Sequence, residues 1–238
     1  MDDRQFSRLL NFLNYSWKGY RKVRKGVKKR VLRHMAELGC RNMDQYLERL
    51  AEDPGIRAEC ECRMTVSISR FFRDLRLWEI LENRLLPELR GQSRGYVRGW
   101  FAGCAGGEEV YSFRMLWESF IAGCPDPPNL YLIATDVVPD YLERAKQGVY
   151  PKGALRDTDA HRREKWFLQV KKEQYRVAPS LKEKIDWRVQ DLLKDNPPAE
   201  ELDIVFLRNN LLTYYQQELV EEPLERIIDA LRPGGASW

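Results

Sequence analysis

The sequence predicts an α/β fold, in which helices cover both faces of a parallel sheet, preceded by a small all-helical N-terminal domain. Two patterns carry this prediction. Apolar residues recur at helical spacing through the first ninety residues, and short apolar runs alternate with amphipathic segments after Gly91. Strands that alternate with helices are typical of parallel sheets. We therefore expect a helical domain with its linker helix over residues 1–90 and a sheet domain over residues 91–238.

The N-terminal region is expected to contain one long amphipathic helix. Its apolar stripe consists of residues spaced three or four apart, namely Tyr20, Val23, Val27, Val31, Met35 and Leu38. Gly39 is expected to end this helix, and Asn42 with Gln45 has the spacing of a capping box that begins a shorter one. A further helix is predicted over residues 75–89.

Apolar runs in the second region predict the strands of the sheet. They lie at residues 96–102, 130–134, 185–189 and 203–207. The amphipathic segments predict helices, at residues 108–120, 139–146 and about 217–231. Each of the first two helices would follow a strand directly, which is the arrangement of a parallel sheet.

The composition argues against several functional classes. Of the 238 residues, 43% are hydrophobic and 32% charged, and no apolar run reaches the roughly 18 residues of a membrane-spanning helix. Five scattered cysteines are an odd number, which argues against a disulfide framework, and two histidines offer no zinc-ligand spacing. We expect a cytoplasmic protein without a metal site and without membrane insertion.

A strongly basic segment lies inside the long N-terminal helix. Residues 18–33 contain nine Lys or Arg residues and no acidic residue, although the net charge of the chain is only +4. The cations occupy the arc that the apolar stripe leaves open, where they either dock an acidic partner or simply solvate the helix. The candidate docking residues are Arg21, Lys22, Arg24, Lys25, Lys28 and Lys29.

A glycine-rich loop follows the first predicted strand. Residues 103–109 read GCAGGEE, between that strand and a helix. In open parallel sheets, ligands bind outside the carboxyl ends of the strands, and small residues there let the backbone come close to a ligand. Glu108 and Glu109 would repel a phosphate, so they favour a positively charged ligand such as a sulfonium or an ammonium. The alternative is a tight turn whose glutamates stabilise the helix dipole.

Polar residues also follow the later strands. Asp136 follows the second strand, where a carboxylate can accept hydrogen bonds from both hydroxyls of a ribose, and capping of the next helix is the alternative. Asp191 follows the third strand, as a contact for an adenine edge or as a loop cap. Arg208, Asn209 and Asn210 follow the fourth, where they would line a pocket floor or form a turn.

In this order the motifs resemble the CheR-type chemotaxis receptor methyltransferases. The matching segments are SISRFFRD, GCAGGEEVYS, ATDVVPDYLERAKQGVY, QDLL and FLRNNLLTYY, and the resemblance covers roughly residues 1–235. It implies a Rossmann-like class I methyltransferase sheet behind a small helical domain, with S-adenosylmethionine as cofactor. The family continues after L-x-P-G-G with further strands, and these C-terminal strands are expected to be missing here.

The resemblance implies which residues contact the methionine end of the cofactor. Ser67, Ser69 and Arg73, in the segment that joins the two domains, would face it. Arg73 would pair with the carboxylate of the cofactor. Glu108, with Glu109 adjacent, would lie near its ammonium group.

The other implied contacts come from the ends of the strands. Gly103 would contact the cofactor from the glycine-rich loop, and Asp136 would hold the ribose. Asp191 and Leu192 would bind the adenine, and Asn209 would form the pocket floor. All of these residues belong to the segments that carry the resemblance.

The resemblance further implies methyl transfer to a glutamate of an acidic, chemoreceptor-like protein helix. A carboxylate is already nucleophilic at pH 7, so positioning and exclusion of water would suffice, and no catalytic residue is assigned. Two alternatives remain. One is a methyltransferase of the same fold with another acceptor, such as RNA or another protein. Against RNA, the chain has no recognisable nucleic-acid module and few aromatics among its basic residues. The other is a non-catalytic cofactor-binding or docking module.

Overall fold

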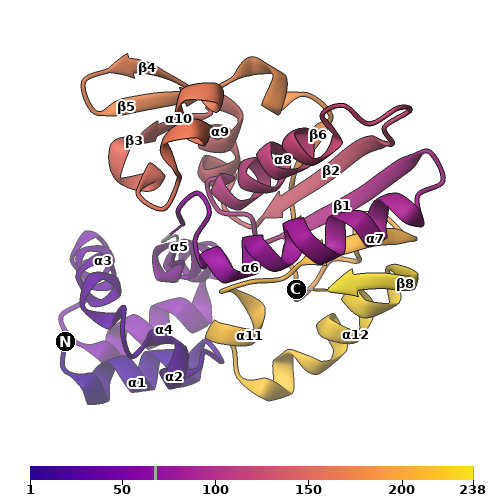
Figure 1. Ribbon diagram of the computed structural model, residues 1–238. Coiled ribbons are helices and arrows are strands. Elements are labelled where there is room, and N and C mark those ends of the chain that lie inside the picture. Colours follow the sequence, from indigo (N-terminus) through magenta and orange to yellow (C-terminus); the bar gives the residue numbers. More distant parts are fainter. Residues whose placement is uncertain (67–68, 238) are drawn as a thin grey trace. The chain divides into compact units, whose positions relative to one another are not determined.

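The computed structural model describes residues 1–66 and 69–237, which form two compact units (Figure 1). The first unit consists of Met1–Ser67 with Arg208–Leu224, and the second of Ile68–Leu207 with Glu225–Trp238. Residues 75–91 lie in the second unit, because their buried apolar side chains share a core with the strands. The domain boundary expected at residue 90 stays a prediction.

Helices build most of the first unit. They are α1 (Asp3–Phe12), α2 (Trp17–Tyr20), α3 (Arg24–Glu37), α4 (Met43–Glu52) and α5 (Pro54–Met64). The predicted apolar stripe is buried at Tyr20, Val27, Val31 and Met35, but a turn at residues 21–23 divides the expected single helix into α2 and α3. Asn42 caps α4 as expected, since its side chain accepts a 3.0 Å hydrogen bond from the Gln45 N–H.

A segment distant in sequence completes the first unit. It contains α11 (Leu211–Tyr214) and the 3₁₀ turn η4 (Gln217–Leu219). Backbone hydrogen bonds fix it to the loop after α1: Ser16 N–H donates to the Tyr214 carbonyl at 2.7 Å, and Gln216 N–H donates to the Asn14 carbonyl at 3.0 Å. The following helix, α12 (Glu221–Asp229), begins and ends inside the helix predicted at residues 217–231.

The second unit is built on a parallel sheet. Within the described residues this sheet has five strands in the order β6-β2-β1-β7-β8, and Figure 1 shows β1 and β2 beside each other in it. The four strands predicted from the sequence are β1 (Tyr96–Ala102), β2 (Asn129–Asp136), β6 (Ile185–Val189) and β7 (Leu202–Phe206). Their pairings are all parallel, so their carboxyl ends meet at one edge.

The helices of the second unit begin close to the predicted positions. They are α6 (Leu75–Ile80), the π-helical turn η1 (Leu81–Leu85), α7 (Leu86–Gly91), α8 (Glu108–Ile121) and α9 (Pro139–Gln147). The apolar residues of α8 are buried in the same core as Phe101 of β1 and Leu132 of β2. Burial of α8 against the sheet therefore fixes the helix start, which carries Glu108 and Glu109.

A small antiparallel sheet between α9 and β6 is absent from the sequence prediction. It pairs β3 (Val149–Pro151), β5 (Gln174–Val177) and β4 (Phe167–Lys171), in that order. The turns η2 (Lys152–Leu155) and η3 (Pro179–Lys182) and helix α10 (Ala160–Trp166) accompany it. These strands have only three to five residues each, and Leu168 in β4 is 66% exposed, so their apolar residues form too short a pattern for a strand prediction.

The final segment forms β8 (Leu231–Ser237), which pairs in parallel with β7. The sequence prediction was therefore wrong in extending the preceding helix to Leu231. Gly235 permits the pairing, because a Cβ there would lie 2.9 Å from the Leu202 carbonyl oxygen. No helix in the described part of the chain is long and apolar enough to cross a membrane.

Candidate cofactor-binding site

Hydrogen bonds join the glycine-rich loop to the end of β2. The N–H groups of Gly103 and Cys104 both donate to the Thr135 carbonyl at 2.8 Å. The next N–H, of Ala105, donates to Oδ2 of Asp136 at 2.9 Å. Gly103 has φ +76°, a conformation that glycine adopts without steric cost, and it lets the chain leave β1 toward β2. The loop thus stands at the carboxyl edge of the sheet.

Two further glycines of this loop lie close to side chains from other elements. A Cβ at Gly106 would lie 2.1 Å from Nη2 of Arg144, and one at Gly107 would lie 2.9 Å from the indole ring of Trp187. Arg144 comes from α9 and Trp187 from β6. The small residues of the loop therefore admit neighbouring side chains, a reason that the sequence alone did not reveal.

Glu108 is a buried carboxylate at the first position of α8. It is 4% exposed, and its Oε1 lies 3.8 Å from Nη2 of Arg144. Its Oε2 has no hydrogen-bond partner among the described residues. Burial raises the pKa of Glu108, while its own N–H, Arg144 and a hydrogen bond with Ser69 lower it. A buried carboxylate oxygen without a partner is costly, and a cationic ligand would compensate it.

Asp136 ends β2 beside the glycine-rich loop and is 9% exposed. Oδ1 accepts a 3.0 Å hydrogen bond from the Val138 N–H, while Oδ2 accepts the one from Ala105. Asp136 does not cap α9, whose N-cap residue is Val138, so the capping alternative is wrong. Burial raises the pKa of Asp136, and the backbone hydrogen bonds lower it. Each oxygen still has a lone pair for a further donor such as a hydroxyl.

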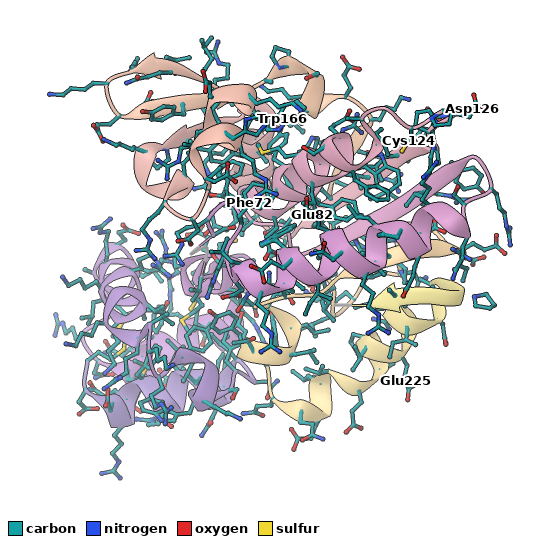
Figure 2. The ribbon with its side chains drawn as sticks, in the orientation of Figure 1. Phe72, Glu82, Cys124, Asp126, Trp166 and Glu225 are labelled. Atoms are coloured by element: carbon teal, nitrogen blue, oxygen red, sulfur yellow. The ribbon has the colours of Figure 1, made fainter. Side chains whose placement is uncertain are left out.

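The segment before α6 lies against the first turns of α8. Phe72 N–H donates to the hydroxyl of Ser112 at 3.0 Å, and that hydroxyl donates to the Glu108 carbonyl at 2.7 Å. Phe72 itself is fully buried in the second unit (Figure 2). Ser69 and Arg73 flank this contact, and the Arg73 carbonyl accepts a 2.8 Å hydrogen bond from the Trp78 ring N–H. Ser67 lies outside the described residues.

The other predicted cofactor contacts lie in the loops after β6 and β7. Asp191 and Leu192 begin the loop after β6; Oδ1 of Asp191 accepts from the Leu193 N–H at 3.0 Å, and Oδ2 pairs with Lys194 at 2.8 Å. Asp191 therefore acts as a loop cap here, as the alternative stated. Asn209 follows β7 with φ +54° and belongs to the first compact unit. Its neighbour Asn210 caps α11, which is the turn role.

The predicted docking residues separate into two groups on the first unit. Arg24 and Lys28 both pair with Oδ1 of Asp3, at 3.1 Å for Arg24, and so join α3 to α1. The hydrogen bond from Lys28 is the largest influence that lowers the pKa of Asp3. The other four, Arg21, Lys22, Lys25 and Lys29, are exposed. Exposed cations are the ones that a partner can reach.

Comparison with known proteins identifies the family. Residues 67–236 match the family described as CheR methyltransferase, SAM binding domain. The chain belongs to the CheR methyltransferase family. The predicted family, the methyltransferase fold and S-adenosylmethionine as cofactor are thereby confirmed.

Named relatives agree with this membership. The CheR-family chain is 29% identical over 209 residues to the chemotaxis protein methyltransferase of Listeria innocua, across 88% of this chain and 77% of that protein. It is 29% identical over 219 residues to chemotaxis protein methyltransferase 1 of Pseudomonas aeruginosa, across 88% and 78%. It is also 31% identical over 211 residues to an uncharacterized 104.1 kDa protein of Rhodobacter capsulatus, across 88% of this chain but 22% of that protein.

The carboxyl edge of the sheet fits this cofactor. S-adenosylmethionine carries a sulfonium and an ammonium, and the edge presents the buried carboxylates of Glu108 and Asp136. The unpartnered Oε2 of Glu108 supplies an acceptor for a cationic donor. Among the described residues, no group of three or more potential metal ligands lies together.

Proposed function

We propose that this chain is a protein-glutamate O-methyltransferase that acts on acidic, chemoreceptor-like helices. The single observation that carries the proposal is the buried Glu108 with its unpartnered oxygen, at the sheet edge that also holds Asp136. Membership in the CheR family and the similarity to chemotaxis protein methyltransferases support the acceptor class. A cytoplasmic location stays a prediction.

We assign the cofactor contacts as follows. Glu108 would receive the ammonium group, because Oε2 is an acceptor without a donor and Arg144 only reaches Oε1. Asp136 would accept hydrogen bonds from the ribose hydroxyls, because the hydrogen bonds from the Ala105 and Val138 N–H groups leave each of its oxygens one free lone pair. Arg73 would pair with the cofactor carboxylate.

Other contacts depend on local rearrangement. Asp191 already holds the Leu193 N–H and the Lys194 side chain, so binding of an adenine edge would have to compete with that ion pair. The backbone N–H of Leu192 is the simpler donor in this loop. Ser69, Gly103 and Glu109 complete the proposed set within the second unit.

The proposed methyl transfer requires only that the acceptor carboxylate be positioned and water be excluded. When bound, S-adenosylmethionine supplies an electrophilic methyl group on a sulfonium. The acceptor carboxylate is ionised at neutral pH and needs no general base, so the residues of this chain orient it and exclude water. The buried core behind the glycine-rich loop is suited to keeping water out of that edge.

The exposed cations of the first unit would attract the acceptor. Arg21, Lys22, Lys25 and Lys29 stand on the basic segment and are reachable, whereas Arg24 and Lys28 are engaged by Asp3. A cluster of one sign raises the local concentration of an oppositely charged partner and its rate of association. An acidic helix has the charge that this face favours.

Methyl-labelled cofactor distinguishes the proposal from its alternatives. The protein is incubated with labelled S-adenosylmethionine and, separately, with a glutamate-rich chemoreceptor peptide or with RNA. Protein label that is released by mild base identifies a carboxyl ester and supports the proposal. Label in RNA, or transfer to neither acceptor while the cofactor binds, would contradict it in favour of another acceptor or of a docking module.

A further inference from the structure

Tyr150 lies at the centre of a contact that links the small antiparallel sheet to the glycine-rich loop. It belongs to β3 and is 1% exposed. Its hydroxyl donates a 2.6 Å hydrogen bond to the carbonyl of Gly106. Gly106 precedes Glu108 by two positions, so the bond acts on the segment that presents the proposed ammonium acceptor.

The ring of Tyr150 also supports the segment that carries Ser69 and Arg73. The rings of Phe71 and Tyr150 pack edge to face, with centroids 4.8 Å apart and planes at 87°. Phe71 N–H donates to the Ala154 carbonyl at 3.0 Å, and Ala154 lies in η2 directly after β3. One tyrosine therefore contacts both the glycine-rich loop and the segment before α6.

The hydroxyl of Tyr150 is well placed to remain a donor. Burial raises the pKa of Tyr150 well above its ordinary value, and the nearby Glu108 carboxylate raises it further. The hydroxyl therefore stays protonated throughout the working pH range, and the bond to the Gly106 carbonyl persists.

We propose that Tyr150 is a positioning residue for the cofactor, which holds the glycine-rich loop through Gly106 and the Ser69–Arg73 segment through Phe71. This inference rests on the proposed cofactor contacts and extends them to a sheet that contributes none of them. Tyr150 is not itself one of the proposed cofactor contacts. It acts by keeping two contacting segments in a fixed relation to each other.

The same substitution at a neighbouring tyrosine provides a matched control. Tyr175 in β5 stands directly opposite Tyr150 in the antiparallel pairing. Replacing Tyr150 by phenylalanine removes the hydroxyl that binds Gly106 and keeps the ring against Phe71. Tyr175→Phe makes the identical chemical change within the same sheet, and among the described residues no hydrogen bond joins the Tyr175 hydroxyl to the glycine-rich loop.

The test measures loop mobility and cofactor binding in the purified chain. In Tyr150→Phe, hydrogen exchange of the amides of residues 103–109 in the cofactor-free protein and the Kd for S-adenosylhomocysteine should both rise about threefold to tenfold, the range of one neutral hydrogen bond. The KM for S-adenosylmethionine should rise with kcat at saturating cofactor unchanged. Tyr175→Phe should match wild type in all of these measurements.

A second substitution tests whether the two contacts of Tyr150 form one support. Phe71→Leu removes the edge-to-face contact and should also weaken binding of S-adenosylhomocysteine. The double variant should lose less affinity than the product of the single effects, because both substitutions act through the same support. Full additivity would overturn the claim that Tyr150 couples the two segments.

Other outcomes are equally decisive. Equal Kd values for wild type and Tyr150→Phe overturn the proposal, as does equal weakening by Tyr175→Phe, which would indicate general destabilisation of the small sheet. Wild type is titrated first, so its failure to bind S-adenosylhomocysteine would count against the proposed cofactor site itself and is distinguished from failure of the Tyr150 proposal.

Discussion

Ala105 and Asp136 are joined by a 2.9 Å hydrogen bond from the backbone N–H of one to the carboxylate of the other. This bond connects the loop after β1 to the end of β2, so the carboxylate has a structural role before any ligand binds. Its position also follows from the parallel register, in which Ala102 pairs with Thr135. The residue proposed for the ribose therefore also shapes the loop that carries Glu108.

Glu108 is predicted to destabilise the cofactor-free protein and to strengthen binding of the cofactor. Its buried carboxylate has a raised pKa and an oxygen without a partner among the described residues. Replacing it by glutamine removes the buried charge, so Glu108→Gln should raise the melting temperature of the cofactor-free protein at neutral pH and weaken binding of S-adenosylmethionine. Differential scanning calorimetry and calorimetric titration measure the two effects. Glu143→Gln, at an exposed residue of α9, is the control and should change neither.

The pH dependence of this effect has a definite sign. Because burial raises the pKa of Glu108 in the folded state, the folded protein holds a proton that the unfolded chain has lost between the ordinary and the raised pKa. Stability from this group is therefore greatest below the ordinary pKa of a glutamate and falls as pH rises through the raised one. Cofactor affinity should change the opposite way, because a cation requires the ionised carboxylate. A Glu108→Gln variant with the wild-type pH profile of stability would contradict this.

Arg73 is predicted to contribute to cofactor binding from outside the sheet. A charge-assisted contact with a carboxylate is typically worth about 1.5–3 kcal/mol, so Arg73→Ala should raise the Kd about tenfold to a hundredfold. Arg76→Ala, at an exposed residue of α6, provides the control. The measurement is a titration with S-adenosylhomocysteine. A dissociation constant unchanged in Arg73→Ala would show that the segment before α6 does not contact the cofactor.

The strands of the main sheet could be predicted because local sequence determines them. Tyr96–Ala102 is an apolar run that ends at a glycine, and the structure places β1 at the same residues. β3, β4 and β5 could not be predicted in this way, since each strand is very short and β3 pairs with β5 across a long stretch of sequence, as in the pairing of Val149 with Arg176. β8 was hidden by its Pro-Gly-Gly sequence, which is unusual inside a strand.

The acidic residues of the site could be predicted from the sequence, whereas the residues that hold the site in place could not. Glu108 and Asp136 follow strands, and parallel strands end at one edge, so the sequence order brings these carboxylates together. Tyr150 and Gly106 are separated by 44 positions, and only the fold reveals that they share a hydrogen bond. Likewise, nothing in the spacing of Arg24 and Lys28 distinguishes them from the exposed cations, because their partner Asp3 comes from another helix.

The exposed cations are predicted to steer the acceptor. Replacing Arg21, Lys22, Lys25 and Lys29 by glutamine should lower kcat/KM for an acidic peptide about tenfold at low salt, within the range of electrostatic steering. The wild-type rate should fall as salt is raised, because the Debye length shrinks from about 10 Å at 0.1 M to about 3 Å at 1 M. Cofactor affinity should stay constant, since these residues are not cofactor contacts.

The paired cations of the same helix give the matching control. Replacing Arg24 and Lys28 by glutamine breaks both contacts with Asp3 and should lower the melting temperature. The loss is expected to be modest, because solvent screens ion pairs at the protein surface. Steady-state kinetics at low salt show which of the two groups of cations attracts the acceptor peptide. If the fourfold variant of the exposed cations turns over the peptide as fast as wild type, the basic face only solvates the helix.

The proposed cofactor site at the carboxyl edge of the sheet is tested by titrating wild type and Asp136→Ala with S-adenosylhomocysteine and, in parallel, with NAD. Wild type should bind S-adenosylhomocysteine and bind NAD poorly. Asp136→Ala should lose most of the affinity for S-adenosylhomocysteine, because the ribose acceptor and the hydrogen-bond acceptor for the Ala105 N–H disappear together. Tighter binding of NAD than of S-adenosylhomocysteine, or full affinity in Asp136→Ala, would contradict the proposed site.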